Sequence, residues 1–371
     1  MPEWVDEWPS DRIPLTSTRR LRAVRAAHQG PRAGTQRRHG WRRTAADERL
    51  LYAAARFGAI TLRQAATFYG GVTETARRRA RYMAEAGLLV RSDNVRWTGT
   101  LLSATAAGIA ASTPPGHPLL REITPGEGGL LHRLLLAETA LRAETRGLTV
   151  VSERQARTLE RVRDDGHAAE RFAARCGIHT ASGAGGEGDF GKVRPSVVGD
   201  GRPRWWAIPA NTEGGLHWPD AVVVAPAGLL ALEVELVAKQ PHRTRMVLRA
   251  YQWAIERGHF AQVLWLVTPD VRVQLEGHRD RHGHWRDGLL AEHGLVASGA
   301  PPDWSARRHA MVVRPVTPTD DGLAYALSQR LLAPPHRCSY RQWRQHRTVW
   351  AAAGTSLDFE AWITRLHTRI R

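Results

Sequence analysis

Three carboxylates stand close together in an otherwise apolar part of the chain. Asp220 precedes the apolar run AVVVA, and Glu233 and Glu235 interrupt the apolar stretch LLALEVELVAK. Side chains two residues apart on a strand project from the same face, so both glutamates point in one direction. Because burying an unpaired charge costs much free energy, the pattern predicts that something compensates these two charges.

The three carboxylates are suited to binding a hard divalent cation. We expect Asp220, at the start of one strand, and Glu233 and Glu235, on its hairpin partner, to converge at one end or face of a sheet. Oxygen ligands without a soft ligand nearby favour Mg²⁺ or Mn²⁺. Such an ion activates water and stabilises the charge that develops on a phosphate during hydrolysis. The residues therefore predict a metal-dependent nuclease site.

Lys239 is the nearest basic residue to these glutamates in the sequence. It follows Glu235 by four positions, and Lys192 is the only other lysine in the chain. The pKa of a lysine, unlike that of an arginine, is readily shifted into a catalytically useful range. We predict that Lys239 handles water or phosphate; the alternative is that it ends the strand and pairs with Glu235.

The carboxylates require a framework of strands and helices. Apolar spacing predicts a helix over 129–147, a strand over 148–154, a strand hairpin over 218–239, a helix over 241–258 and strands over 259–270 and 309–316. This order predicts an α/β (α+β) domain with a mixed sheet over residues 128–330. The Gly-rich and Arg-rich segment at about 157–215 is predicted to be a disordered insertion.

Residues 44–113 form a second predicted domain. Three helices over 47–58, 61–70 and 73–87 are followed by two strands around a turn at 92–94, which is the order of a winged helix-turn-helix. In that fold the third helix enters the major groove of DNA. The predicted DNA contacts on this helix and the hairpin are Arg77, Arg78, Arg79, Arg81, Arg91 and Arg96. The alternatives are a merely solvated basic face or a surface for protein contacts.

The charge of the whole chain favours a nucleic acid as its partner. The formal net charge is +17, and no acidic residue occurs between Arg12 and Ala46. Arginine binds phosphate through its planar fork, so we expect double-stranded DNA as the partner. Arg243 and Arg245, on the helix after the glutamates, are expected to contact phosphate or neutralise the acids.

Three further segments complete the predicted domain organisation. Residues 1–43 are predicted to be a flexible basic arm, 114–127 a proline-containing linker and 331–371 a basic helical tail. The sequence has no apolar run of membrane-spanning length and no signal peptide, so we expect a cytoplasmic protein without a membrane partner. Cys176 and Cys338 lie far apart, which argues against a disulfide framework or a cysteine metal cluster.

The motifs resemble a known family. Pro219-Asp220 followed by Glu233-Val234-Glu235 resembles the PD-(D/E)XK nuclease superfamily. Together with the upstream domain and the stretches LLHRLLLAETALRAE and VVSER, residues 47–316 are similar to the replication-relaxation proteins of actinobacterial plasmids and integrative elements. The resemblance implies a winged helix followed by a nuclease-like domain, with Asp220 and Glu233 as metal ligands and Glu138 as a helical acidic contributor.

The chain departs from the superfamily at one position. Glu235 stands where the superfamily usually has a lysine that orients the attacking water, so Lys239 is expected to supply the missing positive charge. Some restriction endonucleases of the superfamily have glutamate at this position.

The sequence leaves three functions open. The first is a DNA-binding protein of plasmid or integrative-element replication or transfer with a metal-dependent DNA endonuclease domain. The second is a catalytically inactive DNA-binding replication or transcription factor, whose acids are held by Arg243 or Arg245. The third is a scaffold that recruits a relaxase or replication initiator through the tryptophan-bearing tail. Divalent-metal binding and DNA cleavage distinguish the first from the other two.

Overall fold

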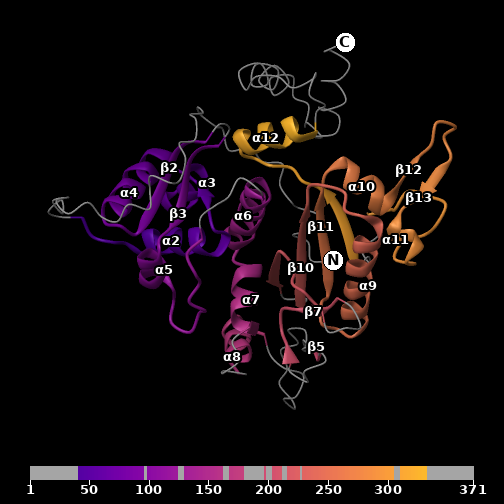
Figure 1. Cartoon of the computed structure of the whole chain (residues 1–371), viewed down its shortest axis with the longest axis horizontal. Helices are drawn as coiled ribbons and strands as arrows, with labels where there is room; N and C mark the ends of the chain where they lie inside the picture. Colours follow the sequence, from indigo (N-terminus) through magenta and orange to yellow (C-terminus); the bar gives the residue numbers. More distant parts are fainter. Residues whose placement is uncertain are drawn as a thin grey trace, which may run out of the picture. The chain divides into compact units, whose positions relative to one another are not determined.

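The computed structural model describes residues 41–331, apart from 96–97, 124–128, 162–166, 179–195, 198–202, 211–214, 226–227 and 305–309 (Figure 1). These residues form two compact units. The small-sheet unit comprises the described residues of 41–114, 119–138 and 317–331, and the large-sheet unit those of 115–118 and 139–316. The boundary falls inside helix α6 (Leu130–Thr145). Most of the predicted arm and tail lie outside the described residues.

The small-sheet unit contains the predicted three helical segments followed by a hairpin. Its elements are α2 (Ala45–Phe57), β1 (Ile60–Thr61), α3 (Leu62–Ala66), the 3₁₀ helix η2 (Thr67–Tyr69), α4 (Thr73–Glu85), β2 (Leu89–Val95), β3 (Gly99–Ala104) and α5 (Ala106–Ser112). The strands form one antiparallel sheet in the order β1-β3-β2. α12 (Asp321–Leu331) and the first part of α6 also belong to this unit.

Local sequence explains where these helices begin and which face they bury. Thr44 and Asp47 form a capping box at the start of α2, in which each side chain accepts a hydrogen bond from the other residue's backbone N–H. On α4, Ala76, Ala80 and Met83 are fully buried at the spacing of one helical face. The opposite face of α4 is therefore left exposed to solvent.

The predicted hairpin turn at 92–94 is wrong. β2 continues to Val95 and β3 starts at Gly99, with a register shift between Ser92 and Val95. Asp93 belongs to the strand, where its carboxylate accepts hydrogen bonds from Arg91 at 3.1 Å and from the Thr100 hydroxyl at 2.8 Å. An irregularity of this kind accommodates turn-forming residues within a strand.

The large-sheet unit has a mixed sheet. Its principal elements are β4 (Thr149–Ser152), β9 (Ala221–Ala225), β10 (Gly228–Glu235), α9 (Pro241–Glu256), β11 (Gln262–Val267), α10 (Pro269–Glu276) and β14 (Met311–Pro315). The strand order is β14-β11-β10-β9-β4. β14, β11 and β10 are parallel, whereas β9 is antiparallel to both β10 and β4. The predicted α/β class with a mixed sheet is confirmed.

One buried cluster joins this sheet to the helix that follows the glutamates. It includes Ala231 of β10, Trp265 of β11 and Tyr251 of α9. A small excursion after α10 consists of β12 (Gly277–Arg279), β13 (Trp285–Asp287) and α11 (Leu289–Glu292), and Leu289 and Leu290 also belong to the cluster.

The predicted disordered insertion is wrong where the structure describes it; residues 162–166, 179–195, 198–202 and 211–214 lie outside the described residues. It contains α7 (Glu153–Arg161), which starts just before it, α8 (Ala168–Arg175), and the short strands β5 (Ser196–Val197), β6 (Pro203–Arg204) and β7 (Ile208–Pro209); β7 pairs with β8 (Leu216–His217). The adjacent Trp205 and Trp206 are 2% and 0% exposed. Both of their backbone N–H groups donate to the Glu160 carboxylate at 2.8 Å. Burial of two large aromatic side chains orders a segment whose Gly and Arg content suggested a loop.

Candidate functional site

The sheet brings four acidic residues together at one end of three of its strands. In the strand register, Ala221 is paired with Leu232 of β10 on one side and with Ser152 of β4 on the other. The start of β9, the end of β10 and the end of β4 therefore lie together. Asp220 immediately precedes β9, Glu233 and Glu235 close β10, and Glu153 immediately follows β4. We call these four residues the carboxylate cluster.

Asp220 links the strands of this cluster. Its Oδ2 accepts a hydrogen bond from the backbone N–H of Val234 at 2.8 Å, which holds the carboxylate against the chain between Glu233 and Glu235. Its carbonyl accepts from the backbone N–H of Glu153 at 2.9 Å. The structure thus brings together Asp220, Glu233 and Glu235, which the sequence analysis selected.

Glu233 is the most deeply buried member, with an exposed fraction of 3%. Its Oε1 lies 2.8 Å from His217 Nε2 and also accepts a hydrogen bond from the Tyr251 hydroxyl. Burial lowers the pKa of His217, but the charge and hydrogen bond of Glu233 outweigh it and raise that pKa above its ordinary value. Burial, followed by the charge of Glu233, raises the pKa of Tyr251, which stays protonated. These two partners compensate the buried carboxylate.

Glu235 and Lys239 form an ion pair where the cluster borders a pocket. The Glu235 side chain is 12% exposed, whereas that of Lys239 is 51% exposed. Burial raises the pKa of Glu235, and Lys239 only partly offsets this effect. Gln274 donates a hydrogen bond to the Lys239 carbonyl at 2.6 Å and so ties the chain after β10 to α10. The pairing alternative for Lys239 is therefore realised, while half of its side chain remains accessible to solvent.

Glu153 is a cluster member that the sequence analysis did not select. Burial first, and then the charges of Asp220 and Glu233, raise its pKa, whereas Arg157 opposes the shift. Its signal in the sequence is weak: a glutamate directly after the short buried strand of VVSER. His217 and Tyr251 were not predicted as site residues either. In a chain with 17 histidines, a histidine near a candidate site indicates little by itself.

A pocket opens beside the cluster. Its polar lining consists of His217, Glu235, Lys239, Thr244 and Gln274, and its apolar lining of Val237, Val247, Trp265 and Val271. These residues come from β8, from the end of β10 and the segment after it, from β11, and from α9 and α10. Ligands of open α/β sheets bind at the carboxyl ends of the strands, so this pocket is where a substrate would meet the cluster.

The donor set of the cluster fits a hard divalent cation, although it is not arranged as a ready-made metal centre. Within the part of the chain that the structure describes, no three His, Cys, Asp or Glu side chains are grouped to hold a metal ion. The raised pKa values of Glu153 and Glu235 have burial as their main cause, and neighbouring carboxylates add to it. A bound cation would relieve that repulsion, and Lys239 would have to release Glu235 for the cation to bind.

Glu138 takes no part in this cluster. It belongs to the small-sheet unit, where its carboxylate accepts hydrogen bonds from the backbone N–H of Thr319, at 2.6 Å, and from the Thr319 hydroxyl. Burial and then the charge of Glu138 raise the pKa of Asp320 to about 6. The structure therefore gives Glu138 a local role in joining α6 to the residues before α12, and we leave it out of the candidate site.

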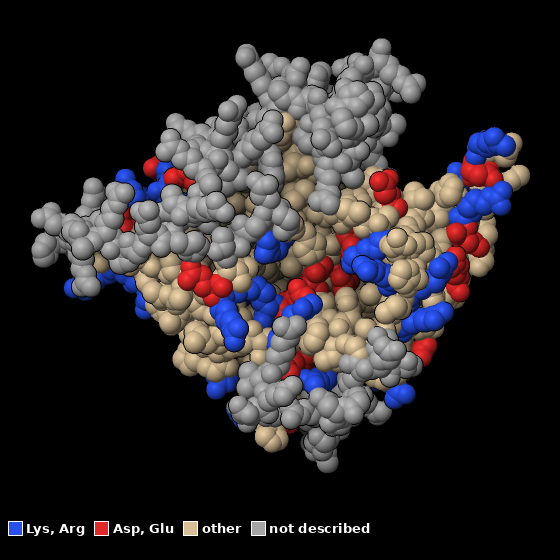
Figure 2. All heavy atoms as spheres, in the orientation of Figure 1, with Lys and Arg blue, Asp and Glu red and all other residues tan. Residues whose placement is uncertain are grey.

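The two arginines of α9 differ in their surroundings. Arg245 donates two hydrogen bonds of 3.0 Å to one carboxylate oxygen of Glu292, so this partner lies outside the cluster. Arg243 lies exposed in the first turn of α9. Figure 2 shows basic and acidic side chains interspersed on the face in view, including the hairpin of β12 and β13, where Arg286 pairs with Asp280 at 3.0 Å.

On α4 the predicted DNA contacts divide into exposed and structural residues. Arg77, Arg78 and Arg81 are exposed, and the ion pairs of Arg77 with Glu74 and of Arg81 with Glu85 are also exposed, hence weak. The hairpin residue Arg91 pairs with Asp93 at 3.1 Å, and Arg96 lies outside the described residues.

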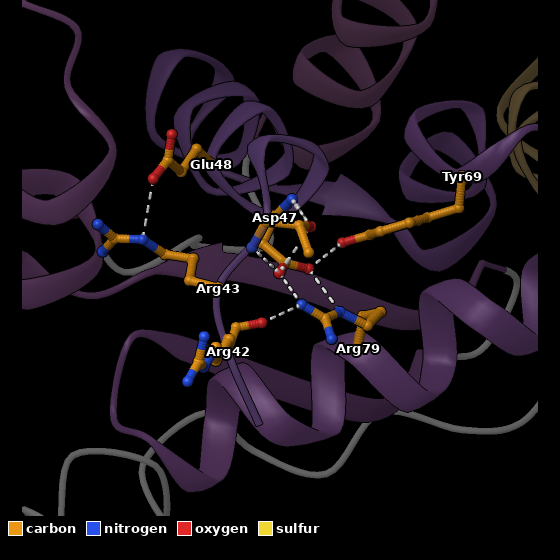
Figure 3. Close-up of polar contacts among 7 residues, drawn as sticks. Arg42, Arg43, Asp47, Glu48, Tyr69 and Arg79 are labelled. Atoms are coloured by element: carbon orange, nitrogen blue, oxygen red, sulfur yellow. Dashed lines mark hydrogen bonds and ion pairs between the residues drawn. The ribbon is translucent and has the colours of Figure 1, made fainter. Parts of the chain in front are cut away.

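The prediction that Arg79 lies on the exposed side of α4 is wrong: its side chain is only 16% exposed. Its guanidinium donates both Nε and Nη2 hydrogen bonds to Asp47, a side chain with an exposed fraction of 0% (Figure 3). Arg79 lies at the edge of the buried face of α4, and a buried carboxylate 32 residues upstream in the sequence holds it there. Its guanidinium group therefore makes these hydrogen bonds inside the small-sheet unit.

Comparisons with protein-family models, with curated proteins and with solved structures find no match for this chain. The resemblance to the replication-relaxation proteins thus stays a prediction based on the motifs quoted above. Among the helices that the structure describes, none is long and apolar enough to cross a membrane.

Proposed function

We propose that this protein binds double-stranded DNA and hydrolyses its phosphodiester bonds with the help of Mg²⁺ or Mn²⁺. The observation that carries the proposal is the hydrogen bond from Val234 N–H to Asp220, which gathers Asp220 with Glu233 and Glu235 at the end of β10 beside a pocket. Neighbouring carboxylates with an adjacent lysine suit cation-assisted phosphate chemistry.

DNA binding is assigned to the small-sheet unit. The order of three helical segments and a hairpin is that of a winged helix-turn-helix, in which the helix before the hairpin is the one that reads the major groove. In this chain that helix is α4, whose exposed face carries Arg77, Arg78 and Arg81. The excess of basic residues in the whole chain supports a polyanionic partner.

Asp220, Glu235 and Glu153 are the residues that would hold the cation. When bound, the cation would supply an activated water and neutralise charge on the phosphate. Glu233 stays buried, and His217 and Tyr251 keep it in place. Lys239, once released from Glu235, is the group that would contact the phosphate from the pocket side.

A cleavage assay on supercoiled plasmid with Mg²⁺ or Mn²⁺ tests the proposal. The wild type should nick or linearise the plasmid, and Asp220→Asn should not, while both bind the plasmid equally well. Glu292→Gln, which removes a carboxylate of the same unit that pairs with Arg245, is the matched control and should cleave normally. Equal cleavage by the wild type and Asp220→Asn would contradict the proposal.

A second candidate function is DNA binding without cleavage. It is favoured by the absence of a grouped metal site among the described residues and by the partners that Glu233 and Glu235 already have. In this case neither metal changes the thermal midpoint of the protein, and neither the wild type nor Glu233→Gln cleaves DNA. In either form, we propose a member of the replication-relaxation family that serves the replication or transfer of a mobile element in the cytoplasm.

A further inference from the structure

A buried network ties the chain just before α2 to the exposed helix α4 (Figure 3). At its centre the Asp47 carboxylate accepts hydrogen bonds from the backbone N–H of Thr44 at 2.7 Å, the Tyr69 hydroxyl at 2.6 Å and Arg79 Nε at 2.9 Å. Burial alone would raise the pKa of Asp47, but the bonds from Arg79, Tyr69 and Thr44 together hold it below its ordinary value. Asp47 therefore stays charged, and the network persists at neutral pH.

Arg79 extends the network to residues that precede the helix cap. Its Nη2 donates to the Arg42 carbonyl at 2.8 Å, and its guanidinium lies 5.4 Å from the centre of the Trp41 ring. The Trp41 ring is in turn 6.3 Å from that of Tyr82, one helical turn further along α4. Neither interaction is needed to cap α2 or to neutralise Asp47. Their effect is to hold residues 41–43 along the side of α4.

The chain segment held beside α4 carries two arginines. Arg42 uses only its carbonyl in the network, and its exposed side chain points away from Asp47 (Figure 3). Arg43 is also exposed, and its pair with Glu48 at 3.1 Å is open to solvent. An exposed pair of this kind contributes little and exchanges readily for another anion.

We propose that Arg42 and Arg43 form one phosphate-binding surface with Arg77, Arg78 and Arg81 of α4, and that Asp47 and Arg79 are its positioning residues. The ligand is the phosphate backbone of duplex DNA flanking the groove that α4 enters, so the inference rests on the proposed DNA binding. Contacts to backbone phosphates set the register of a protein on DNA, and a fixed chain beside the recognition helix is suited to that task. The surface joins residues from two segments that are more than 30 positions apart in the sequence.

The first test is the salt dependence of DNA binding by the full chain. A plot of log K against log salt should be less steep for the double variant Arg42→Ala/Arg43→Ala than for the wild type. The magnitude of the slope should fall by about 0.9 for each phosphate that the variant no longer neutralises, thus by about 1.8 in total. Arg257→Ala/Arg286→Ala, which removes two exposed arginines of the other unit that are not predicted DNA contacts, is the control and should leave the slope unchanged. An unchanged slope in the first variant would overturn the inference.

The second test shows whether Arg79 positions these arginines. Lysine at position 79 can pair with Asp47 but cannot also reach the Arg42 carbonyl through a planar fork. Arg42→Ala/Arg43→Ala should therefore weaken binding less in an Arg79→Lys background than in the wild type, in a double-mutant cycle. Strictly additive losses would mean that Arg79 stabilises the fold without positioning the surface. Trp41→Ala, which keeps every hydrogen bond of Asp47, repeats the cycle should Arg79→Lys unfold.

Failure of the inference can be told apart from failure of the proposed function. If the wild type does not bind duplex DNA, the proposed function itself is contradicted. If binding depends on Arg77, Arg78 and Arg81 but does not change in Arg42→Ala/Arg43→Ala, only the proposal that all five arginines form one phosphate-binding surface is contradicted.

Discussion

The Asp220 carboxylate accepts a hydrogen bond of 2.8 Å from the backbone N–H of Val234, the residue between Glu233 and Glu235. This hydrogen bond holds the carboxylate of Asp220, just before β9, beside the two carboxylates at the end of β10. Of the two acids at the end of β10, Glu233 is buried against His217 and Tyr251. Glu235 lines the pocket and pairs with the half-exposed Lys239.

Asp47→Ala should destabilise the small-sheet unit strongly. Removing one partner of a buried ion pair leaves Arg79 and Tyr69 without their acceptor, and such changes cost about 3–5 kcal/mol. Chemical denaturation followed by circular dichroism measures the loss. Glu48→Ala, which removes only the exposed partner of Arg43, is the control and should stay within about 0.5 kcal/mol of the wild type. A neutral Asp47→Ala would show that the network does not stabilise the unit.

Asp47 also predicts an acid dependence of stability. Because its pKa is lowered in the folded protein, its contribution is complete above the unfolded value of 3.8 and is lost as the pH falls through the folded value. The thermal midpoint of the wild type should therefore fall more steeply below pH 4 than that of Asp47→Asn. Parallel curves for the two proteins would contradict this account.

The pairing of His217 with Glu233 predicts the opposite sign. The raised pKa of His217 means that its contribution is complete below the unfolded value of 6.5 and is lost as the pH rises through the folded value. The thermal midpoint should drop over this interval in the wild type and be flatter in Glu233→Gln. His282→Asn, a variant at an exposed histidine of the β12–β13 excursion, should follow the wild type. The same slope in Glu233→Gln as in the wild type would exclude the coupling.

Lys239→Ala should separate cation binding from cleavage. The change frees Glu235 from its ion pair, so Mn²⁺ should stabilise the variant at least as much as the wild type. Cleavage should nevertheless fall, by roughly 10²-fold or more, because the group expected to handle water or phosphate is gone. Thermal midpoints with and without Mn²⁺, and plasmid cleavage, are the two measurements. Cleavage at the wild-type rate would assign Lys239 to pairing alone.

We expect weaker DNA binding in the triple variant Arg77→Ala/Arg78→Ala/Arg81→Ala. A plot of log K against log salt should also be less steep, by about 0.9 for each phosphate that the variant no longer neutralises. These side chains are exposed, so the thermal midpoint should change little. Fluorescence anisotropy at several salt concentrations measures both the affinity and the slope. Retained affinity with an unchanged slope would move DNA binding away from α4.

The sequence predicted the framework of the site better than its partners. The apolar runs around Glu233 and Glu235 indicated a strand, and the period of two put both acids on one face. Glu153 became visible only with the register of β4 against β9, which a single sequence does not contain. Arg79 resembled its exposed neighbours because helical spacing alone does not reveal that Asp47 is its partner. Trp205 and Trp206 are two apolar residues in a segment without periodicity, so their burial depends on tertiary packing.

Binding of Mn²⁺ to the DNA-free protein, followed by electron paramagnetic resonance, tests the central claim most directly. It asks whether the carboxylate cluster holds a cation, whatever DNA sequence the protein prefers. We predict that the wild type binds Mn²⁺ at a site that Asp220→Asn abolishes and that Glu292→Gln leaves intact. Absence of binding by the wild type, or equal binding by Asp220→Asn, would contradict the account and leave a DNA-binding protein whose acids are structural.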